Sequence, residues 1–191
     1  STRFNVAAFG CLGYELDVNN LSYREKQEVR RQIAFFKAHR AALQYGTFYR
    51  GDPDRANQMT WQCVDKERNR GVGAFFQTKA EPGGRVDRLK LYGLDPQRHY
   101  RVETVPQRIF IKRFGSLVSH ALPIHLRADG WLFQKINRFY AMNDSVETHV
   151  GDGRLLKSGL LLNDQFSGTG YHPNLRILGN YGSNLYTIEA V

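Results

Sequence analysis

The stretch ALQYGTFYRGDP, residues 42–53, decides the fold of this chain because the hydrophobic pattern changes within it. Before Gly46 the apolar residues recur at the spacing of a helix. From Thr47 onward they alternate with polar residues, as in strands that bury one face. Residues 1–46 and residues 47–191 are therefore predicted to form two different units, with a boundary at about residue 46.

The first unit contains one long predicted helix. Ser22 precedes Glu25 by three residues, the spacing of a capping box in which each side chain satisfies a backbone N–H of the first turn. Gly46 is predicted to end the helix in a left-handed conformation. The helix is then about 23 residues long, or roughly 34 Å. Its apolar residues follow a helical period and are Val29, Ile33, Phe36 and Leu43.

Residues 4–9 are apolar and are predicted to form a short buried strand before this helix, and residues 14–17 are read as a second short piece. A helix with a single apolar stripe packs on a sheet, but the pattern predicts no second parallel strand here. The two elements therefore indicate the closing unit of a larger α/β domain. We expect the stripe of the helix to be exposed, or to pack on a second copy of the chain.

The second unit is predicted to be an antiparallel β-sandwich, because many short strands with a period of two are separated by glycine, proline and aspartate turns. The chain is thus expected to be mainly β. The predicted strands are residues 47–50, 59–65, 72–78, 88–91, 99–103, 108–114, 121–126, 131–133, 139–142, 146–150 and 186–189.

Composition limits the class of protein. Among 191 residues there are 27 Lys and Arg against 18 Asp and Glu, a net charge of +9. In residues 65–90 the charges alternate with apolar residues, which favours a solvated sheet face and subunit contacts over a nucleic-acid partner. No apolar run is long enough to span a bilayer, so no membrane partner is expected. Two cysteines, Cys11 and Cys63, favour a reducing compartment, which we take to be the cytoplasm. Because the chain begins at Ser1, we expect a piece of something longer.

The residues themselves reveal no catalytic or metal-binding constellation. The six histidines lie far from metal-ligand spacing and are His39, His99, His120, His125, His149 and His172. The glycine-rich stretches 151–153 and 166–171 lack the form of a phosphate-binding loop and are predicted to be surface loops. No metal and no cofactor is therefore expected.

Carboxylates and aromatic residues leave two weaker possibilities. Glu15 and Asp17 lie two residues apart, so on a strand both would share one face, but a polar turn before the helix is the favoured interpretation. Trp61, Trp131 or Tyr171 could form a sugar-stacking platform, although core packing explains most of the aromatic content.

Four stretches resemble a known family. Residues 2–17 (TRFNVAAFGCLGYELD) resemble the end of the catalytic barrel in bacterial α-galactosidases of glycoside hydrolase family thirty-six, and residues 35–40 with 46–50 resemble the junction that follows it. Residues 89–96 (LKLYGLDP), and residues 159–171 with 178–186, are similar to motifs of the family's C-terminal sandwich.

The resemblance implies a fold in which the last strand and helix of a (β/α)₈ barrel, residues 1–46, precede a C-terminal β-sandwich, residues 47–191. It implies a retaining hydrolase that removes terminal α-galactose from melibiose or raffinose with two aspartates and without a metal. The motifs of both aspartates precede the matching segment, so no catalytic residue is expected in this chain, and the chain alone is predicted to be inactive. Asn180 and Asn184 depart from the Asp and Arg that the family implies there.

The resemblance also implies partners: the upstream barrel of the same polypeptide, an α-galactoside bound by the parent enzyme, and further copies in a homo-oligomer. A different class of function stays open beside it. The β-sandwich could be a non-catalytic carbohydrate-binding module, in which case coplanar aromatic rings should lie exposed on one sheet face. Buried tryptophans would favour an ordinary core.

Overall fold

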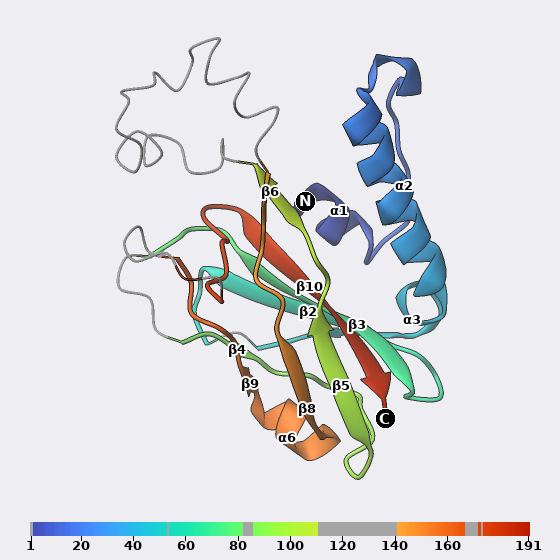
Figure 1. Ribbon diagram of the computed structural model, residues 1–191. Coiled ribbons are helices and arrows are strands. Elements are labelled where there is room, and N and C mark those ends of the chain that lie inside the picture. The colour runs from blue at the N-terminus through green and yellow to red at the C-terminus, as the bar shows by residue number, and fades with distance from the viewer. Residues whose placement is uncertain (1, 53, 82–85, 111–140, 167–171, 173) are drawn as a thin grey trace.

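The computed structural model (Figure 1) describes residues 2–52, 54–81, 86–110, 141–166, 172 and 174–191. Its helices are α1 (Thr2–Ala7), the 3₁₀ turn η1 (Val18–Asn20), α2 (Tyr23–Ala38), α3 (Arg40–Tyr45) and α6 (Gly153–Ser158). Its strands are β1 (Thr47–Arg50), β2 (Gln58–Val64), β3 (Arg70–Gln77), β4 (Arg88–Leu89), β5 (His99–Thr104), β6 (Arg108–Phe110), β7 (Ala141–Asn143), β8 (Thr148–Asp152), β9 (Leu160–Leu161) and β10 (Gly182–Ala190).

A six-stranded antiparallel sheet in the order β1-β2-β3-β10-β5-β8 forms the centre of the molecule. The final strand, β10, lies in its middle. Tyr186 of β10 is opposite Gly73 of β3 on one side and opposite Thr104 of β5 on the other. The sheet is therefore complete only when the last residues of the chain join strands that come about a hundred positions earlier. Two short antiparallel pairs, β4 with β9 and β6 with β7, accompany it.

The helices α1, α2 and α3 lie on one side of the sheet (Figure 1). Alternate residues of the central strands face them, because successive side chains of a strand point to opposite faces. The buried residues on this side are Phe4, Ala8, Phe36, Leu43, Cys63, Val72, Ala74, Phe76 and Leu185. The stripe of the long helix is therefore partly covered by the sheet of the same chain, contrary to our expectation that it would be bare.

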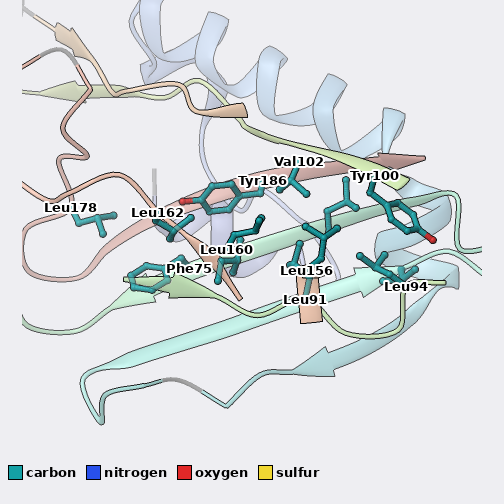
Figure 2. Close-up of a cluster of buried hydrophobic side chains, with 13 residues drawn as sticks. Phe75, Leu91, Leu94, Tyr100, Val102, Leu156, Leu160, Leu162, Leu178 and Tyr186 are labelled. Carbon is teal, nitrogen blue, oxygen red and sulfur yellow. The ribbon is translucent and has the colours of Figure 1, made fainter. Parts of the chain in front are cut away.

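The opposite face of the sheet packs against β4, β9, α6 and the segments that connect them. Figure 2 shows the buried side chains between the two layers. They are Val64, Phe75, Leu89, Leu91, Leu94, Tyr100, Val102, Leu156, Leu160, Leu162, Leu178, Tyr186 and Ile188. The prediction of a mainly β chain with an antiparallel β-sandwich is thereby confirmed.

The predicted strand at residues 4–9 is wrong, because residues 2–7 form the helix α1. Phe4 and Ala8 are buried, and Ala8 N donates to the Phe4 carbonyl oxygen at 2.8 Å. A spacing of four places both side chains on one helix face, which here packs on the sheet. A short apolar run fits a helix as well as a strand, so its pattern alone does not decide between them.

The predicted long helix is interrupted at His39, where α2 ends and α3 begins. The capping box of Ser22 and Glu25 is confirmed at its start. The predicted left-handed ending is wrong, because Gly46 has φ −83° and ψ −176°. Gly46 is needed for a different reason: a Cβ there would collide with the carbonyl oxygens of Val64 and Ala42.

Most predicted strands are confirmed to within two residues at each end, and β1 matches at both ends. Three short elements were not expected: η1, β9, and α6 within the part of the chain predicted to be entirely β. The predicted strands at 121–126 and 131–133 lie outside the described residues, as does part of those at 108–114 and 139–142. No helix in the described part of the chain is both long enough and apolar enough to cross a membrane.

Candidate functional site

The two carboxylates singled out from the sequence, Glu15 and Asp17, lie in the exposed segment before α2. Asp17 is the N-cap of η1, where its side chain accepts hydrogen bonds from Asn19 N and Asn20 Nδ2, each at 2.9 Å. Glu15 is exposed. The interpretation of this stretch as a polar turn before the helix is confirmed for Asp17.

The histidines in the described residues have separate surroundings. His39 packs against Phe35 with ring centroids 4.5 Å apart and the rings tilted by 44°, and burial lowers the pKa of His39. His99 and His172 are exposed, and His149 hydrogen-bonds to Glu147. His120 and His125 lie outside the described residues. Among the residues that the structure describes, no three His, Cys, Asp or Glu side chains are grouped so as to hold a metal ion.

The glycine-rich stretch 151–153 is the junction of β8 and α6 rather than a loop. Asp152 is the N-cap of α6 and accepts from Leu155 N at 2.8 Å, so the helix end is occupied by a side chain of the protein itself. Gly153 lies where a Cβ would meet the Asp95 backbone. This arrangement joins two layers and leaves no cradle for a phosphate. Residues 167–171 lie outside the described part of the chain.

The aromatic residues of β1 and β2 pack edge to face instead of forming a flat platform. Trp61 is half-buried, and its ring lies 5.9 Å from Phe9, 6.0 Å from Phe48 and 4.9 Å from Phe76, with interplanar angles of 74°, 70° and 60°. Such contacts are typical of hydrophobic packing. They do not provide the coplanar rings that a carbohydrate-binding module would need. The other candidates, Trp131 and Tyr171, lie outside the described residues.

A cleft lies between α1, α2 and the segment that follows β5. It is lined by Phe4, Asn5, Glu28, Arg31, Gln32, Phe35, Val105, Pro106, Gln107 and Leu185. Glu28 is its one carboxylate, and it accepts from Gln32 Nε2 at 3.2 Å and lies 3.9 Å from Arg31. A retaining glycosidase needs two carboxylates roughly 5 Å apart, so this cleft does not have the groups for that reaction.

The polar groups that do converge are buried inside the sandwich, and sequence reasoning missed them. The first pair is Arg176 and Asp87, in which Arg176 Nη2 donates to Asp87 Oδ2. Gln58 Nε2 donates to Asp87 Oδ1 at 2.7 Å, and Gln165 Nε2 donates to Oδ2 at 2.5 Å. The guanidinium carbon lies 5.2 Å from the centroid of the Phe75 ring. Arg176 is only 1% exposed.

Glu147 is the second buried carboxylate of this group. It accepts from Asn163 N at 2.9 Å and from His149 Nε2 at 3.0 Å, and Arg176 Nε lies 4.0 Å away. Burial by itself raises the pKa of Glu147, but the two hydrogen bonds and the charge of Arg176 together hold it below its usual value. Tyr186 OH lies 3.4 Å from Glu147, and burial raises the pKa of this phenol far above its usual range.

Asp144 is the third buried carboxylate, and four neutral donors surround it. Its Oδ1 accepts from Ser145 N and Ile177 N, each at 3.0 Å. Its Oδ2 accepts from Gln107 Nε2 at 2.8 Å and from Asn184 Nδ2 at 2.6 Å. Position 184, where the family resemblance implies Arg, thus contributes a neutral amide. Asn180 accepts from Ala80 N at 2.9 Å.

We call Asp87, Asp144, Glu147 and Arg176 the buried polar network. Its three carboxylates are 3%, 4% and 6% exposed, and their oxygens are occupied by protein donors. They therefore hold the segment before β10 against the sheet and are not placed to meet a substrate. The prediction that the charges of residues 65–90 are solvated is wrong for two residues, because Asp87 and Asp65 are buried. Asp65 accepts from Asn69 N at 2.8 Å and from Arg70 N at 3.1 Å.

Two protein families match the chain in separate ranges. The glycosyl hydrolase family 36 C-terminal domain matches residues 58–188, and the Melibiase family matches residues 1–46. The first match covers more than half of the chain.

Curated relatives are α-galactosidases. AgaA from Geobacillus stearothermophilus is 40% identical over 103 residues, which are 53% of this chain and 14% of AgaA. Mel36A from Lactobacillus acidophilus is 37% identical over 101 residues, which are 53% of this chain and 14% of Mel36A. The chain therefore spans only a small part of these relatives.

The fold agrees with a solved structure from the same group of proteins. The crystal structure of AgaA superposes on 99% of this chain and 19% of its own, with a TM-score of 0.62 and 26% sequence identity. Forms of AgaA have also been crystallised with raffinose and with stachyose. From the sequence match and the shared antiparallel architecture we conclude that the chain belongs to glycosyl hydrolase family 36.

Proposed function

We propose that this chain is the C-terminal portion of an α-galactosidase, a retaining glycoside hydrolase that removes terminal α-galactosyl residues from oligosaccharides such as melibiose and raffinose. The observation that carries the proposal is the pair of family matches, Melibiase at residues 1–46 and the family 36 C-terminal domain at residues 58–188. Relatives that share both the sequence and the fold are α-galactosidases, and AgaA has been crystallised with raffinose.

The proposed role of this segment is structural, and the catalytic aspartates belong to the part of the longer polypeptide that precedes it. Support comes from the carboxylates of the described residues. Those that converge are sealed in the buried polar network, and Glu28 is the one carboxylate among the described residues that line the cleft. The reaction proposed for the parent protein requires neither a metal nor a cofactor.

We further propose that residues 1–46 complete the catalytic barrel, and that residues 47–191 form the C-terminal sandwich domain. The surface of the first unit supports this division. Leu16, Val18 and Tyr23 are exposed around η1 and the start of α2, and residues 11–15 carry no helix or strand. A barrel strand next to residues 11–17 would pair with this segment and cover these side chains, since a strand needs a neighbour to satisfy its backbone.

Two proposals concern the whole protein. We propose that it assembles into a homo-oligomer and that it works in the cytoplasm. The second is supported by the two cysteines, which are both free: Cys11 is exposed and Cys63 is buried. Free thiols persist where the environment is reducing.

The test compares two polypeptides on an aryl α-galactoside. The longer protein that contains this chain should release galactose with retention of configuration, and the 191-residue chain alone should not. Turnover by the purified chain would refute the upstream position of the catalytic pair. A longer protein that leaves α-galactosides intact while hydrolysing another glycoside would refute the substrate assignment.

A second test addresses the barrel contact. Val18→Asp should leave the melting temperature of the 191-residue chain unchanged, because the side chain is exposed there, but should lower that of the longer protein. Asn19→Asp, one residue along the same exposed turn, is the matched control for the added charge. Equal melting temperatures for all the longer proteins would contradict the proposed contact.

A further inference from the structure

Among the described strands, β8 forms one edge of the central sheet. It pairs with β5 in the register His99↔Asp152 to Glu103↔Thr148. The ladder is extended by hydrogen bonds from Thr104 N to the Glu147 carbonyl oxygen at 3.0 Å and from Gly153 N to the Arg98 carbonyl oxygen at 3.2 Å. Hydrogen-bonded pairs alternate along an antiparallel ladder. Glu147, His149 and Gly151 therefore direct their backbone groups toward β5, and Thr148 and Val150 direct theirs away from the sheet.

The side chains along this edge favour strand pairing. Val146 and Val150 are 57% and 56% exposed, and Thr148 between them is exposed as well. All three are β-branched residues of high strand propensity. Edge strands are usually protected from other strands by lysine, proline or a bulge. Residues 146–150 contain neither lysine nor proline, and in the described part of the chain no strand pairs with this side of β8.

The exposed residues along this edge read the same in both chain directions. The order Val146, Thr148, Val150 is symmetric about Thr148. A two-fold axis there would place Thr148 opposite the partner's Thr148, and Val146 opposite the partner's Val150. Because Thr148 directs its backbone groups outward, its pair with the partner's Thr148 would be hydrogen-bonded. Identical patches that fit one another in this way are the mark of an isologous dimer.

The same register places Glu147 opposite the partner's His149 on the other face of the strand, where no like charges meet. Thr–Thr cross-strand pairs such as the one at Thr148 stabilise antiparallel strands. The exposed row itself carries no charge, so two copies can meet here although each has a net charge of +9.

We propose that β8 pairs antiparallel with β8 of a second copy, with Thr148 on the two-fold axis, so that one sheet continues through both copies. This inference gives the self-association in the proposed function a definite interface. It does not depend on the α-galactosidase assignment.

A disulfide tests the register. Thr148→Cys in a Cys11→Ser background should form a covalent dimer under mild oxidation. Residues of a hydrogen-bonded antiparallel pair have Cα atoms about 5.5 Å apart, within the range that a disulfide spans. The control is Arg101→Cys, which is exposed on the same face but one strand further in. Two such residues would be three strand spacings apart, about 14 Å, and should not cross-link.

Sedimentation velocity of the full chain tests the contact independently of the added cysteine. The unmodified protein should be a dimer, and Val150→Lys should weaken dimerisation at least tenfold. Leu155→Lys, at an equally exposed residue of α6, should not change it. Circular dichroism should show that all variants keep the native fold. A monomer at all concentrations would overturn both the interface and the self-association. A dimer that Thr148→Cys does not cross-link, or that Arg101→Cys cross-links equally, would overturn the β8 interface alone.

Discussion

Replacing Arg176 by Met should destabilise the protein strongly. The guanidinium donates to Asp87 Oδ2 and, through Nε, to the Asn163 carbonyl oxygen at 2.7 Å, and it lies near Glu147. Methionine fills similar space but leaves two buried carboxylates without their cation. Removing one partner of a buried ion pair costs about 3–5 kcal/mol. For a chain of this size, each kcal/mol lowers the melting temperature by about 2–4 °C, so we expect a fall of about 6–20 °C.

The assay is urea unfolding followed by tryptophan fluorescence, with Arg154→Met as the matched control. Arg154 is exposed and lies 3.6 Å from Asp152, and an exposed ion pair of this kind contributes little to stability. Adding Asp87→Asn to Arg176→Met should recover part of the lost stability, because the unpaired buried charge is removed. The reasoning is refuted if Arg176→Met costs no more than Arg154→Met, or if the second substitution destabilises the protein further.

Three further predictions concern pH, thiols and backbone packing. The folded-state pKa of Glu147 lies below its usual 4.5, so the carboxylate stabilises the fold above pH 4.5, and this stabilisation is lost as the pH falls through the lowered pKa. Glu147→Gln should therefore make the urea midpoint depend less steeply on pH in the acid range. An unchanged dependence of the urea midpoint on pH would contradict this. Exposed Cys11 should react at once with a thiol reagent. Burial raises the pKa of the Cys63 thiol to about 11, so Cys63 should react only after unfolding. Rapid reaction of both thiols in the folded protein would disprove the packing around Cys63. Gly46→Ala should lower the melting temperature, because the new Cβ would collide with two carbonyl oxygens. Gly13→Ala should leave it unchanged, because the new Cβ would meet nothing within 4 Å. Equal melting temperatures for the two variants would count against the collision.

The strands of the central sheet could be predicted because their side chains alternate between the two faces of the sheet. β2 and β3 alternate between the two sides of the sheet: Val72, Ala74 and Phe76 face the helices, and Phe75 faces the opposite layer. That alternation is visible in the sequence because the period of a strand is two. The start of α2 was predictable for a similar reason, since a capping box requires particular residues at a particular spacing.

Short elements were not predictable in the same way. α1 and α6 have six residues each, which is less than two turns. Their apolar residues are too few to separate a period of 3.6 from a period of two. α1 is helical because Phe4 and Ala8 pack on a sheet formed by residues much further along the chain. This tertiary contact, and not local propensity, decides the conformation.

The buried polar network could not be inferred from any local pattern. Asp87 and Arg176 are 89 positions apart, and they meet because β10 inserts between β3 and β5. In the sequence Asp87 stands among alternating charges, which is also how a solvated strand looks. Its burial depends on the segment before β10 lying across it, and that arrangement follows from topology and not from spacing.

The same topology determines what these acids can do. A carboxylate acts as a nucleophile or as a general acid only if a substrate can approach it and if an oxygen is free to react. Asp87, Asp144 and Glu147 fail both conditions, because they are buried and their oxygens accept hydrogen bonds from the backbone, from amide side chains, from His149 or from Arg176. Three acids that converge within a hydrolase family would ordinarily suggest an active site. Here their donors fix the segment before β10 to the sheet, so their convergence explains how the sandwich is held together.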